Sequence, residues 1–280
     1  MELKKQLIEL KAMAKEQIFN LDMDDLIHKM LVNIGTVDPE LRDALIYATF
    51  IRLIDDDFLT GRQLQAVMET CLDHNHLFYR IGETNSDSVF TRSFSSLIIA
   101  AVLEKDKKGS LLPAPLVAKA TASGHSYLRQ ERDTRGYVEG KGWAHSIAHG
   151  ADLLVAAINH PHYRPEQSKA FLDTVRHCLF KDAAVYTDDE DERLIFVIES
   201  LIDKGLEETE FVDWILKVFD DLEMLFEEEG HALTFYRKKR NVTNFFKSLY
   251  FRLGYKNRGD QVRRCIKENL KIWHQRLFIL

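Results

Sequence analysis

The stretch LIDDDFLTGRQLQAVMETCLD (residues 53–73) carries the strongest evidence about the fold, because its layout returns as LIDKGLEETEFVDWILKVFDD (residues 201–221). In both stretches Leu-Ile-Asp ends a helical segment, a short loop follows, and apolar residues then recur at helical spacing. The offset is 148 residues, close to three periods of about 49. Helical hairpins that repeat at somewhat more than 40 residues are typical of HEAT-like and armadillo-like solenoids. The sequence therefore predicts an all-α protein, a HEAT/armadillo-like α–α superhelix, with a compact all-α bundle as the alternative.

Similar pairs of amphipathic segments fill the rest of the chain and predict about five helical hairpins. The first begins at Asp38 and Pro39, an N-cap followed by proline at the first helical position, and Thr60 caps its second helix. We expect one α-solenoid domain over residues 1–280. Its expected parts are an N-terminal capping hairpin at 1–36 that is closed by Gly35, central repeats at 37–230, and a basic C-terminal repeat at 231–280.

The composition agrees with a helical globular protein. Hydrophobic residues make up 45% and charged residues 29% of the 280 residues, and only 13 glycines and 5 prolines are present, too few for the many turns of a sheet protein. Three scattered cysteines predict neither a disulfide framework nor a thiolate zinc site. The N-terminus does not resemble a signal peptide, and the longest apolar run, residues 97–103, is too short to cross a bilayer. We therefore expect a cytoplasmic protein without a membrane segment.

The segment DTRGYVEGKGWAHSIAHGADLL (residues 133–154) departs from plain helix, because four of the thirteen glycines fall between Gly136 and Gly150. Glycine permits positive φ and close backbone approach, so we expect the loop at 133–142 to have a defined shape. Two interpretations remain open. The loop binds a ligand or takes part in catalysis, or it is a tight connection between repeats that needs two left-handed turns.

His145, His149 and Asp152 follow this loop at spacings i, i+4 and i+7, which predicts a shared helical face. Two imidazoles and a carboxylate placed in this way could hold a divalent metal, or could supply a general base and its partner. The alternative is a polar helical face or a buried, hydrogen-bonded pair. Glu139 is a candidate acid or base. Lys141, near the expected start of the helix, is a candidate for binding an anion.

The repeat register relates three of the candidate residues. Arg42, Arg92 and His145 each precede the equivalent helical position of their repeat (Leu53, Leu103 and Ala156) by 11 residues. Equivalent positions stack along one surface of a solenoid, so these three side chains could line one ligand groove. The alternative is that each arginine pairs with an acidic neighbour of its own helix. Trp143 is expected to pack against the preceding repeat rather than to stack on a ligand.

The run RGYVEGKGWAHSIAHGAD (residues 135–152) resembles the signature of an uncharacterised bacterial family, the domain-of-unknown-function family 2785. The resemblance seen in the sequence extends over most of the chain. It implies an all-helical, HEAT-like, cytoplasmic protein, and it implies no reaction. The resemblance also brings Arg135 into the candidate ligand-binding set. That set is Arg42, Arg92, Arg135, Glu139, Lys141, Trp143, His145, His149 and Asp152.

The net charge of −6 conceals a strong separation of charge along the chain. Residues 182–229 hold 18 acidic and 3 basic residues, whereas residues 231–280 hold 13 basic and 2 acidic ones. The simplest interpretation is that neighbouring repeats neutralise each other. Nucleic-acid binding by the basic end and association of two chains are the alternatives, and the aromatic residues interleaved there match helical core positions. Two histidine pairs between helices, His74/His76 and His160/His162, are expected to lie on surface loops.

No P-loop, GxGxxG, GxSxG or CxxC motif is present. We therefore expect a HEAT-like scaffold or binding protein that holds a protein, a peptide or a small anionic ligand at the Gly-rich loop and at His145 and His149. The first alternative is a hydrolase or lyase that uses His145, His149, Asp152 and Glu139, with or without a divalent metal. The second is a nucleic-acid-associated α-solenoid.

Overall fold

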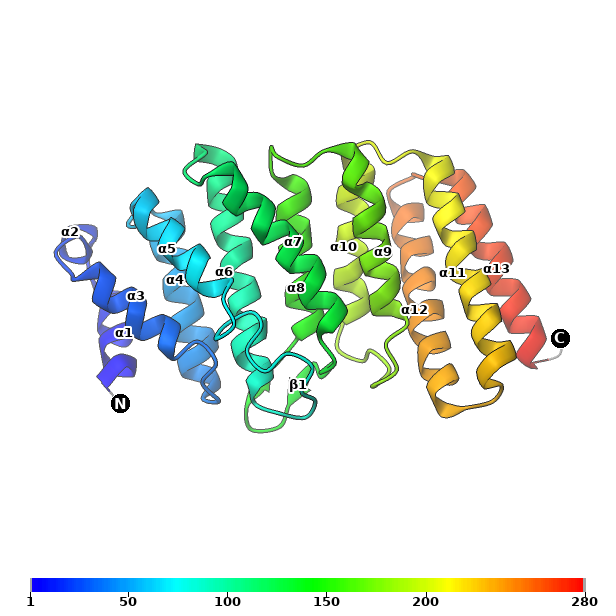
Figure 1. Ribbon diagram of the computed structural model, residues 1–280, viewed down its shortest axis with the longest axis horizontal. Coiled ribbons are helices and arrows are strands. Elements are labelled where there is room, and N and C mark those ends of the chain that lie inside the picture. Colours follow the sequence, from blue (N-terminus) through cyan, green and yellow to red (C-terminus); the bar gives the residue numbers. More distant parts are fainter. Residues whose placement is uncertain (1, 279–280) are drawn as a thin grey trace. The chain divides into compact units, whose positions relative to one another are not determined.

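The computed structural model describes residues 2–278, and side chains up to residue 276. These residues form thirteen α-helices that pack against each other and one short β-hairpin, which confirms the all-α prediction (Figure 1). The chain divides into two compact units, unit 1 (Met1–Tyr163) and unit 2 (Arg164–Leu280). None of the described helices is both long enough and apolar enough to cross a membrane.

Unit 1 consists of paired helices. In Figure 1, α3, α5 and α7 lie in one layer, with α4, α6 and α8 behind them. Helix α3 packs against α5, α4 against α6, and α6 against α8. The elements of unit 1 are α1 (Glu2–Ala12), α2 (Lys15–Ile18), α3 (Met23–Val32), the π-helix η1 (Glu40–Tyr47), α4 (Ala48–Asp55), α5 (Gly61–Cys71), α6 (Ser88–Gly109), α7 (Ala114–Gln130), β1 (Tyr137–Val138), β2 (Gly142–Trp143) and α8 (Ser146–Asn159).

The predicted helix starts are confirmed. A carboxylate oxygen of Asp38 accepts hydrogen bonds from the backbone amides of Glu40 and Leu41, at 3.0 and 3.2 Å. The Thr60 hydroxyl accepts a hydrogen bond from the backbone amide of Gln63, and the side-chain oxygen of Gln63 accepts one from the backbone amide of Thr60. The two residues therefore form a capping box. The first turns after Asp38 are π-helical, a feature that the apolar spacing did not predict.

Two local expectations are wrong. Gly35 does not take the positive φ of a helix-closing glycine. Instead it lies so close to α6 that an added Cβ would collide with the Thr91 hydroxyl. The glycine therefore allows the turn that follows α3 to approach α6. His160 does not lie on a surface loop, because its ring is buried and Nε2 is 3.0 Å from the carboxylate of Asp106.

Helix α6 forms the centre of unit 1, and its buried side chains include Phe90, Phe94, Ile98 and Val102. Lys105 near its end donates to the backbone oxygen of Asp55 at 3.1 Å and pairs with Asp57 at 2.7 Å. The end of α6 therefore contacts the end of α4 and the loop that follows it.

Unit 2 contains the acidic and the basic segments of the chain. Its elements are the 3-10 helix η2 (Pro165–Gln167), α9 (Ser168–Leu179), α10 (Glu190–Asp203), α11 (Glu208–Glu229), α12 (Leu233–Tyr255) and α13 (Asp260–Phe278). The core includes Trp214 of α11 and Phe245 and Phe246 of α12. These two phenylalanines have the core role expected for the aromatics of the basic segment, whereas Tyr236 and Tyr255 are exposed.

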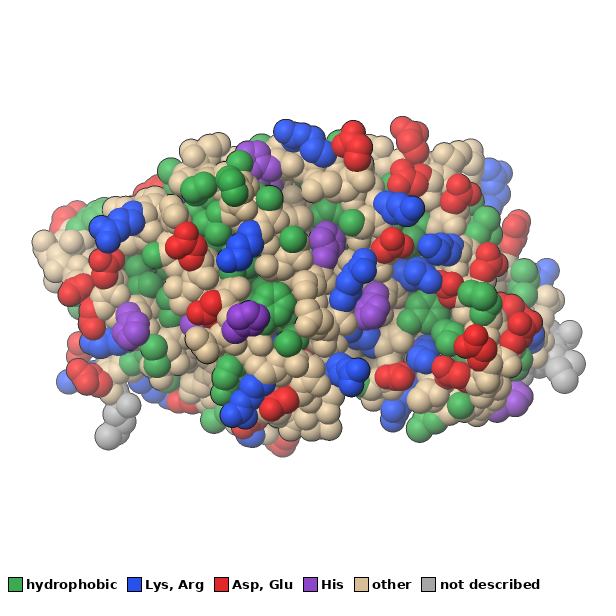
Figure 2. All heavy atoms as spheres, viewed as in Figure 1, with side chains coloured by type: hydrophobic (Ala, Val, Ile, Leu, Met, Phe, Trp, Pro, Cys, Tyr) green, Lys and Arg blue, Asp and Glu red, His purple; other side chains and the backbone are tan. Residues whose placement is uncertain are grey.

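Ion pairs join the acidic and the basic segments within unit 2. Arg252 and Lys256 of α12 bind Glu199 of α10 at 2.9 and 2.7 Å, and Arg258 binds Asp203 at 2.7 Å. Burial opposes the ionisation of Glu199, but the hydrogen bonds from Arg252 and Lys256 outweigh it and lower the pKa of that carboxyl. On the face in Figure 2, basic and acidic side chains are interspersed over unit 2. The acidic and the basic segments of unit 2 therefore neutralise each other in part, in agreement with the simplest interpretation of the charge separation.

Because Glu190, the first residue of α10, is buried, we expect unit 2 to lose stability as the pH rises. Its side chain is buried, and burial raises the pKa of its carboxyl to about 7. A raised pKa means that the folded state holds the proton more tightly, so the stabilisation is complete below the ordinary value of 4.5 and is lost as the pH rises through about 7. The loss amounts to up to about 3 kcal/mol.

Denaturant unfolding between pH 4.5 and 8.5 measures this effect. We expect Glu190→Gln to flatten the decline of the unfolding free energy between pH 4.5 and about 7, and Glu210→Gln, at an exposed position of α11, to leave it unchanged. Parallel curves for the wild type and Glu190→Gln would show that Glu190 is not the group responsible.

Candidate functional site

The Gly-rich loop forms a β-hairpin with a defined backbone. Tyr137 pairs with Trp143 and Val138 with Gly142, and the amide of Lys141 donates to the Val138 carbonyl at 2.9 Å to close the turn. Gly140, the third residue of this turn, has a φ of +73°, a conformation that glycine adopts without strain. The expectation of a shaped loop is confirmed, and two glycines with positive φ, Gly140 and Gly142, produce the shape.

Arg42 holds the hairpin from the side of η1. Its fully buried guanidinium donates to the Lys141 carbonyl at 2.7 Å, to the Thr36 carbonyl at 2.8 Å and to Asp43 at 2.8 Å. It also lies 4.1 Å from the ring centre of Phe90. Burial lowers the pKa of Arg42, opposed by Asp43, but an arginine stays charged at neutral pH. A Cβ on Gly142 would approach the Arg42 guanidinium to 3.2 Å, so only glycine fits beside this anchor.

Further ion pairs fix both ends of the hairpin. Lys141 binds Asp87 at 2.7 Å. Arg135 binds Asp133 at 2.7 Å and donates to the Ser86 carbonyl at 2.8 Å. At the base of the hairpin, the amide of Ala144 donates to the Gly136 carbonyl at 2.7 Å. The hairpin is thus held to the start of α6 through several independent contacts.

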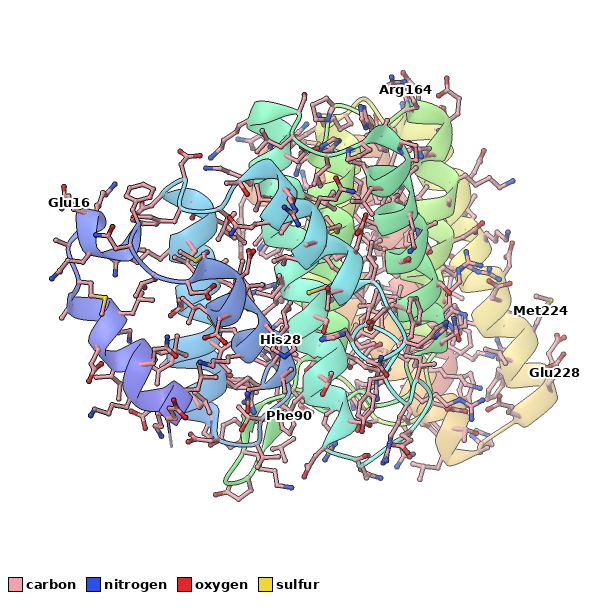
Figure 3. The ribbon with its side chains drawn as sticks, turned by 60° about the vertical axis from the view of Figure 1, so that its left-hand side comes forward. Glu16, His28, Phe90, Arg164, Met224 and Glu228 are labelled. Atoms are coloured by element: carbon pink, nitrogen blue, oxygen red, sulfur yellow. The ribbon has the colours of Figure 1, made fainter. Side chains whose placement is uncertain are left out.

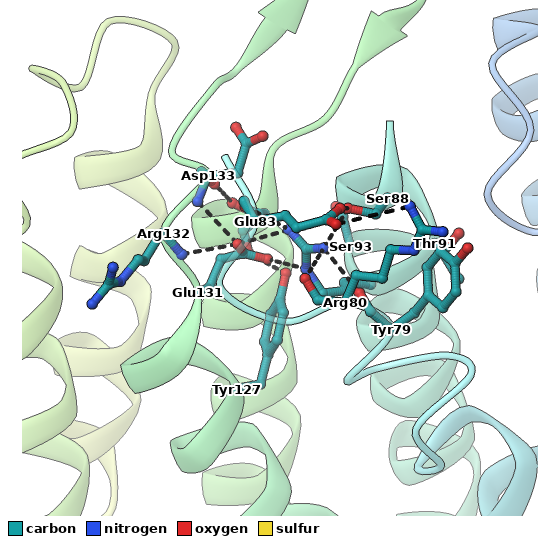
Figure 4. Close-up of polar contacts among 12 residues, drawn as sticks. Tyr79, Arg80, Glu83, Ser88, Thr91, Ser93, Tyr127, Glu131, Arg132 and Asp133 are labelled. Atoms are coloured by element: carbon teal, nitrogen blue, oxygen red, sulfur yellow. Dashed lines mark hydrogen bonds and ion pairs between the residues drawn. The ribbon is translucent and has the colours of Figure 1, made fainter. Parts of the chain in front are cut away.

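Arg92 of α6 forms the most deeply buried ion pair of the site (Figure 4). Its guanidinium binds both carboxylate oxygens of Glu131, at 2.6 and 2.9 Å, and neither side chain is exposed to solvent. The remaining donors contact the Ser88 hydroxyl and the carbonyls of residues 79, 80 and 83. Glu131 also accepts bonds from the amides of residues 132 and 133, so the pair joins α6 to the start of the Gly-rich loop.

The arginines predicted to line a groove are therefore in the interior. Arg42 and Arg92 both have no exposed surface, and they belong to separate hydrogen-bond networks. Each pairs with a carboxylate, and for Arg42 this is the adjacent Asp43, as the alternative interpretation held. Buried arginines of this kind determine where the loop lies rather than contacting a ligand from solution.

His145 does not share a continuous helical face with His149 and Asp152. It has a φ of +47° and precedes α8 as its N-cap, so the helical spacing assumed for the three residues applies only from Ser146 onward. The two imidazole rings are nevertheless neighbours, with centres 5.7 Å apart. Within the described part of the chain, no three His, Cys, Asp or Glu side chains gather in a way that could hold a metal ion.

His149 contacts Ser93, a residue that the sequence did not single out. Nδ1 of His149 is 2.6 Å from the Ser93 hydroxyl oxygen, and the same hydroxyl donates to the Ala144 carbonyl. Because a carbonyl only accepts, the hydroxyl proton lies toward Ala144, and Nδ1 of His149 donates to the hydroxyl oxygen. In this arrangement the imidazole does not activate Ser93 as a nucleophile. The contact instead joins α8, α6 and the end of the hairpin.

The exposed surface of the hairpin is aromatic. Tyr137 is 50% and Trp143 is 43% exposed, and their rings lie edge to face with centres 5.0 Å apart. The His145 ring also contacts Trp143, with the two ring centres 4.4 Å apart. We call Tyr137, Trp143 and His145 the aromatic platform. Trp143, which we expected to pack against the preceding repeat, contacts the rings of Tyr137 and His145 instead. Glu139 is exposed at the tip of the hairpin. Tyr137 was missed, although its place opposite Trp143 across a glycine turn is visible in the sequence.

Comparison with protein-family models matches residues 77–251 to the family described as "Protein of unknown function (DUF2785)". The match covers more than half of the chain, including the whole hairpin, and the chain belongs to this family. No curated protein and no solved structure matches the chain.

Proposed function

We propose that this chain is a HEAT-like helical-repeat binding protein whose aromatic platform engages a protein or peptide partner. The observation that carries the proposal is the exposure of Tyr137 and Trp143 on a hairpin whose backbone is held in place by buried charges. Large aromatic side chains supply most of the energy of many protein interfaces. A rigid loop binds more tightly because less conformational freedom is lost on binding.

The spacing of polar contacts supports the repeat arrangement. In unit 1, Arg135 bonds to a residue 49 positions earlier and His160 to one 54 positions earlier. In unit 2, Arg252 and Arg258 bond to residues 53 and 55 positions earlier. Both units thus join residues about one predicted period apart, as stacked hairpins of a HEAT-like protein do. The single solenoid over residues 1–280 stays a prediction.

The charges of the site favour a protein or peptide over a small anion. The four candidate cations already pair with carboxylates of unit 1, Arg42 with Asp43, Arg92 with Glu131, Arg135 with Asp133 and Lys141 with Asp87. An anion would have to compete with these pairs. The enzyme alternative has less support, because Ser93 is buried with its proton directed at a carbonyl and Glu139 lies at the exposed tip of the hairpin.

Trp143→Ala tests the proposal. We expect peptides selected from a random displayed library to bind the wild-type protein and to bind Trp143→Ala at least 30-fold more weakly, which corresponds to about 2 kcal/mol for an aromatic hot spot. Binding is measured by calorimetry. The thermal midpoint should be unchanged, because the side chain is half-exposed.

Phe251→Ala is the matched control, since Phe251 is an exposed aromatic residue on α12 of unit 2. It should leave binding intact. If the selected peptides bind Trp143→Ala as tightly as the wild type, or if the selection gives no peptide that depends on Trp143, the platform is not the binding site.

A further inference from the structure

A groove runs between α3 and α5 in unit 1, on helices that do not contribute to the aromatic platform. It consists of a cavity of about 320 Å³ and an adjoining one of about 610 Å³. The two cavities share Leu31, Val32 and His76 in their walls and therefore lie next to each other. His28 of α3, which lines the first cavity, is labelled in Figure 3.

The wall that α3 supplies to the first cavity is mainly apolar. Ile27 and Leu31 form its buried part, and Val32 is 68% exposed on the same side of the helix. Across the groove, Ala66 of α5 is exposed and small, so it leaves space in front of this wall. An exposed valine and an exposed alanine that face one cavity form a surface on which an apolar chain would displace water.

Three of the polar side chains that line the first cavity, those of Arg62, His28 and His76, can donate hydrogen bonds to an anion. The Arg62 side chain is exposed, and it makes no ion pair or hydrogen bond with the side chains and backbone that the structure describes. His28 and His76 line the same cavity. Asp73 is 2.8 Å from Nδ1 of His76 and can only accept, so Nδ1 carries a proton and the ring is held in one orientation. Asp24 is the one carboxylate among the residues that line this cavity, and it accepts a hydrogen bond from the side-chain amide of Gln63 at 2.7 Å.

We propose that this groove binds a small carboxylic acid with an unbranched apolar chain. The carboxylate would pair with the Arg62 guanidinium, with His28 as a second donor. The chain would lie along Ile27, Leu31 and Val32 and in front of Ala66. Arginine recognises a carboxylate through two parallel hydrogen bonds, and an arginine not yet paired at the edge of an apolar wall suits an amphiphilic anion. The site is independent of the proposed function, since it shares no residue with the hairpin.

Titration calorimetry of the full chain with hexanoate, octanoate and decanoate, each kept below the concentration at which it aggregates, tests the site. We expect the affinity to rise about fourfold for each added methylene group until the apolar wall is covered. The alcohol with the same chain as octanoate should bind at least tenfold more weakly, because it lacks the charge. No binding of any of these acids, or equal binding of the acid and the alcohol, would overturn the proposal.

Two variants locate the site, and a third serves as the control. Arg62→Met should remove the preference for octanoate over the alcohol, and Ala66→Trp should abolish binding of all three acids by filling the groove. Neither should lower the thermal midpoint, since both positions are exposed. Lys119→Met removes an exposed cation of α7 outside the groove and should change nothing. Unchanged binding by Ala66→Trp would show that the acids bind elsewhere and would refute the assignment.

Discussion

Arg92→Leu is expected to destabilise unit 1 by about 3–5 kcal/mol, the usual cost of breaking a buried ion pair by removing one partner. The reason is that Glu131 would keep its charge in a place without solvent, having lost both of its guanidinium contacts. The carbonyls that accept from Arg92 would lose a donor as well. Trp143 is the only tryptophan of unit 1, so its fluorescence during denaturant unfolding reports on this unit.

The double variant Arg92→Leu/Glu131→Leu provides the control. Removing both charges leaves no isolated ion in the interior, so the double variant should be more stable than Arg92→Leu alone. The recovery should be partial, because Glu131 also accepts bonds from the amides of residues 132 and 133. If the double variant is no more stable than Arg92→Leu, or if Arg92→Leu costs less than about 1 kcal/mol, the pair does not hold the loop as we describe.

Arg42→Met is expected to cost about 2–4 kcal/mol and to loosen the hairpin. Methionine can fill much of the space beside Phe90, but it leaves the carbonyls of Thr36 and Lys141 without their donor, at about 1–3 kcal/mol for each buried group. Because the Lys141 carbonyl is the point at which Arg42 holds the hairpin, the effect should reach the aromatic platform. We therefore expect hydrogen exchange at the Ala144 amide, which is bonded to the Gly136 carbonyl, to accelerate at least tenfold.

Lys141→Met separates this anchor from a surface contact in the same hairpin. The bond from Lys141 to Asp87 is exposed, and its loss should cost under about 1 kcal/mol. Exchange at Ala144 should then stay close to the wild-type rate. Equal acceleration in both variants would mean that the buried guanidinium has no special part in ordering the hairpin.

Local patterns in the sequence were sufficient for the helices and for several of their starts. Asp38 and Thr60 cap helices as predicted. A cap needs only a side-chain oxygen and a backbone amide three residues later, so it depends on residues that are close in sequence. The glycine pattern of the loop predicted a shaped backbone, which the positive φ angles confirm.

The roles of individual residues in the site did not follow from local patterns. The sequence predicted that Arg42 and Arg92 face a ligand. Their partners, the Lys141 carbonyl and Glu131, come from distant segments that only folding brings near them. The helical spacing from His145 to His149 was wrong because His145 takes a left-handed conformation ahead of α8. Ser93 was missed since its partners, the Ala144 carbonyl and His149, lie more than 50 residues away in the sequence.

The amino-acid sequence alone was thus enough to establish the helical class and the shaped loop, because each depends on interactions among residues close in sequence. Folding in three dimensions determined which charges are buried, which face of the hairpin is exposed, and that the platform consists of Tyr137, Trp143 and His145. Burial is a property of the neighbours that a side chain meets across the fold, and two arginines equally placed in the repeat become anchors only when segments from elsewhere enclose them.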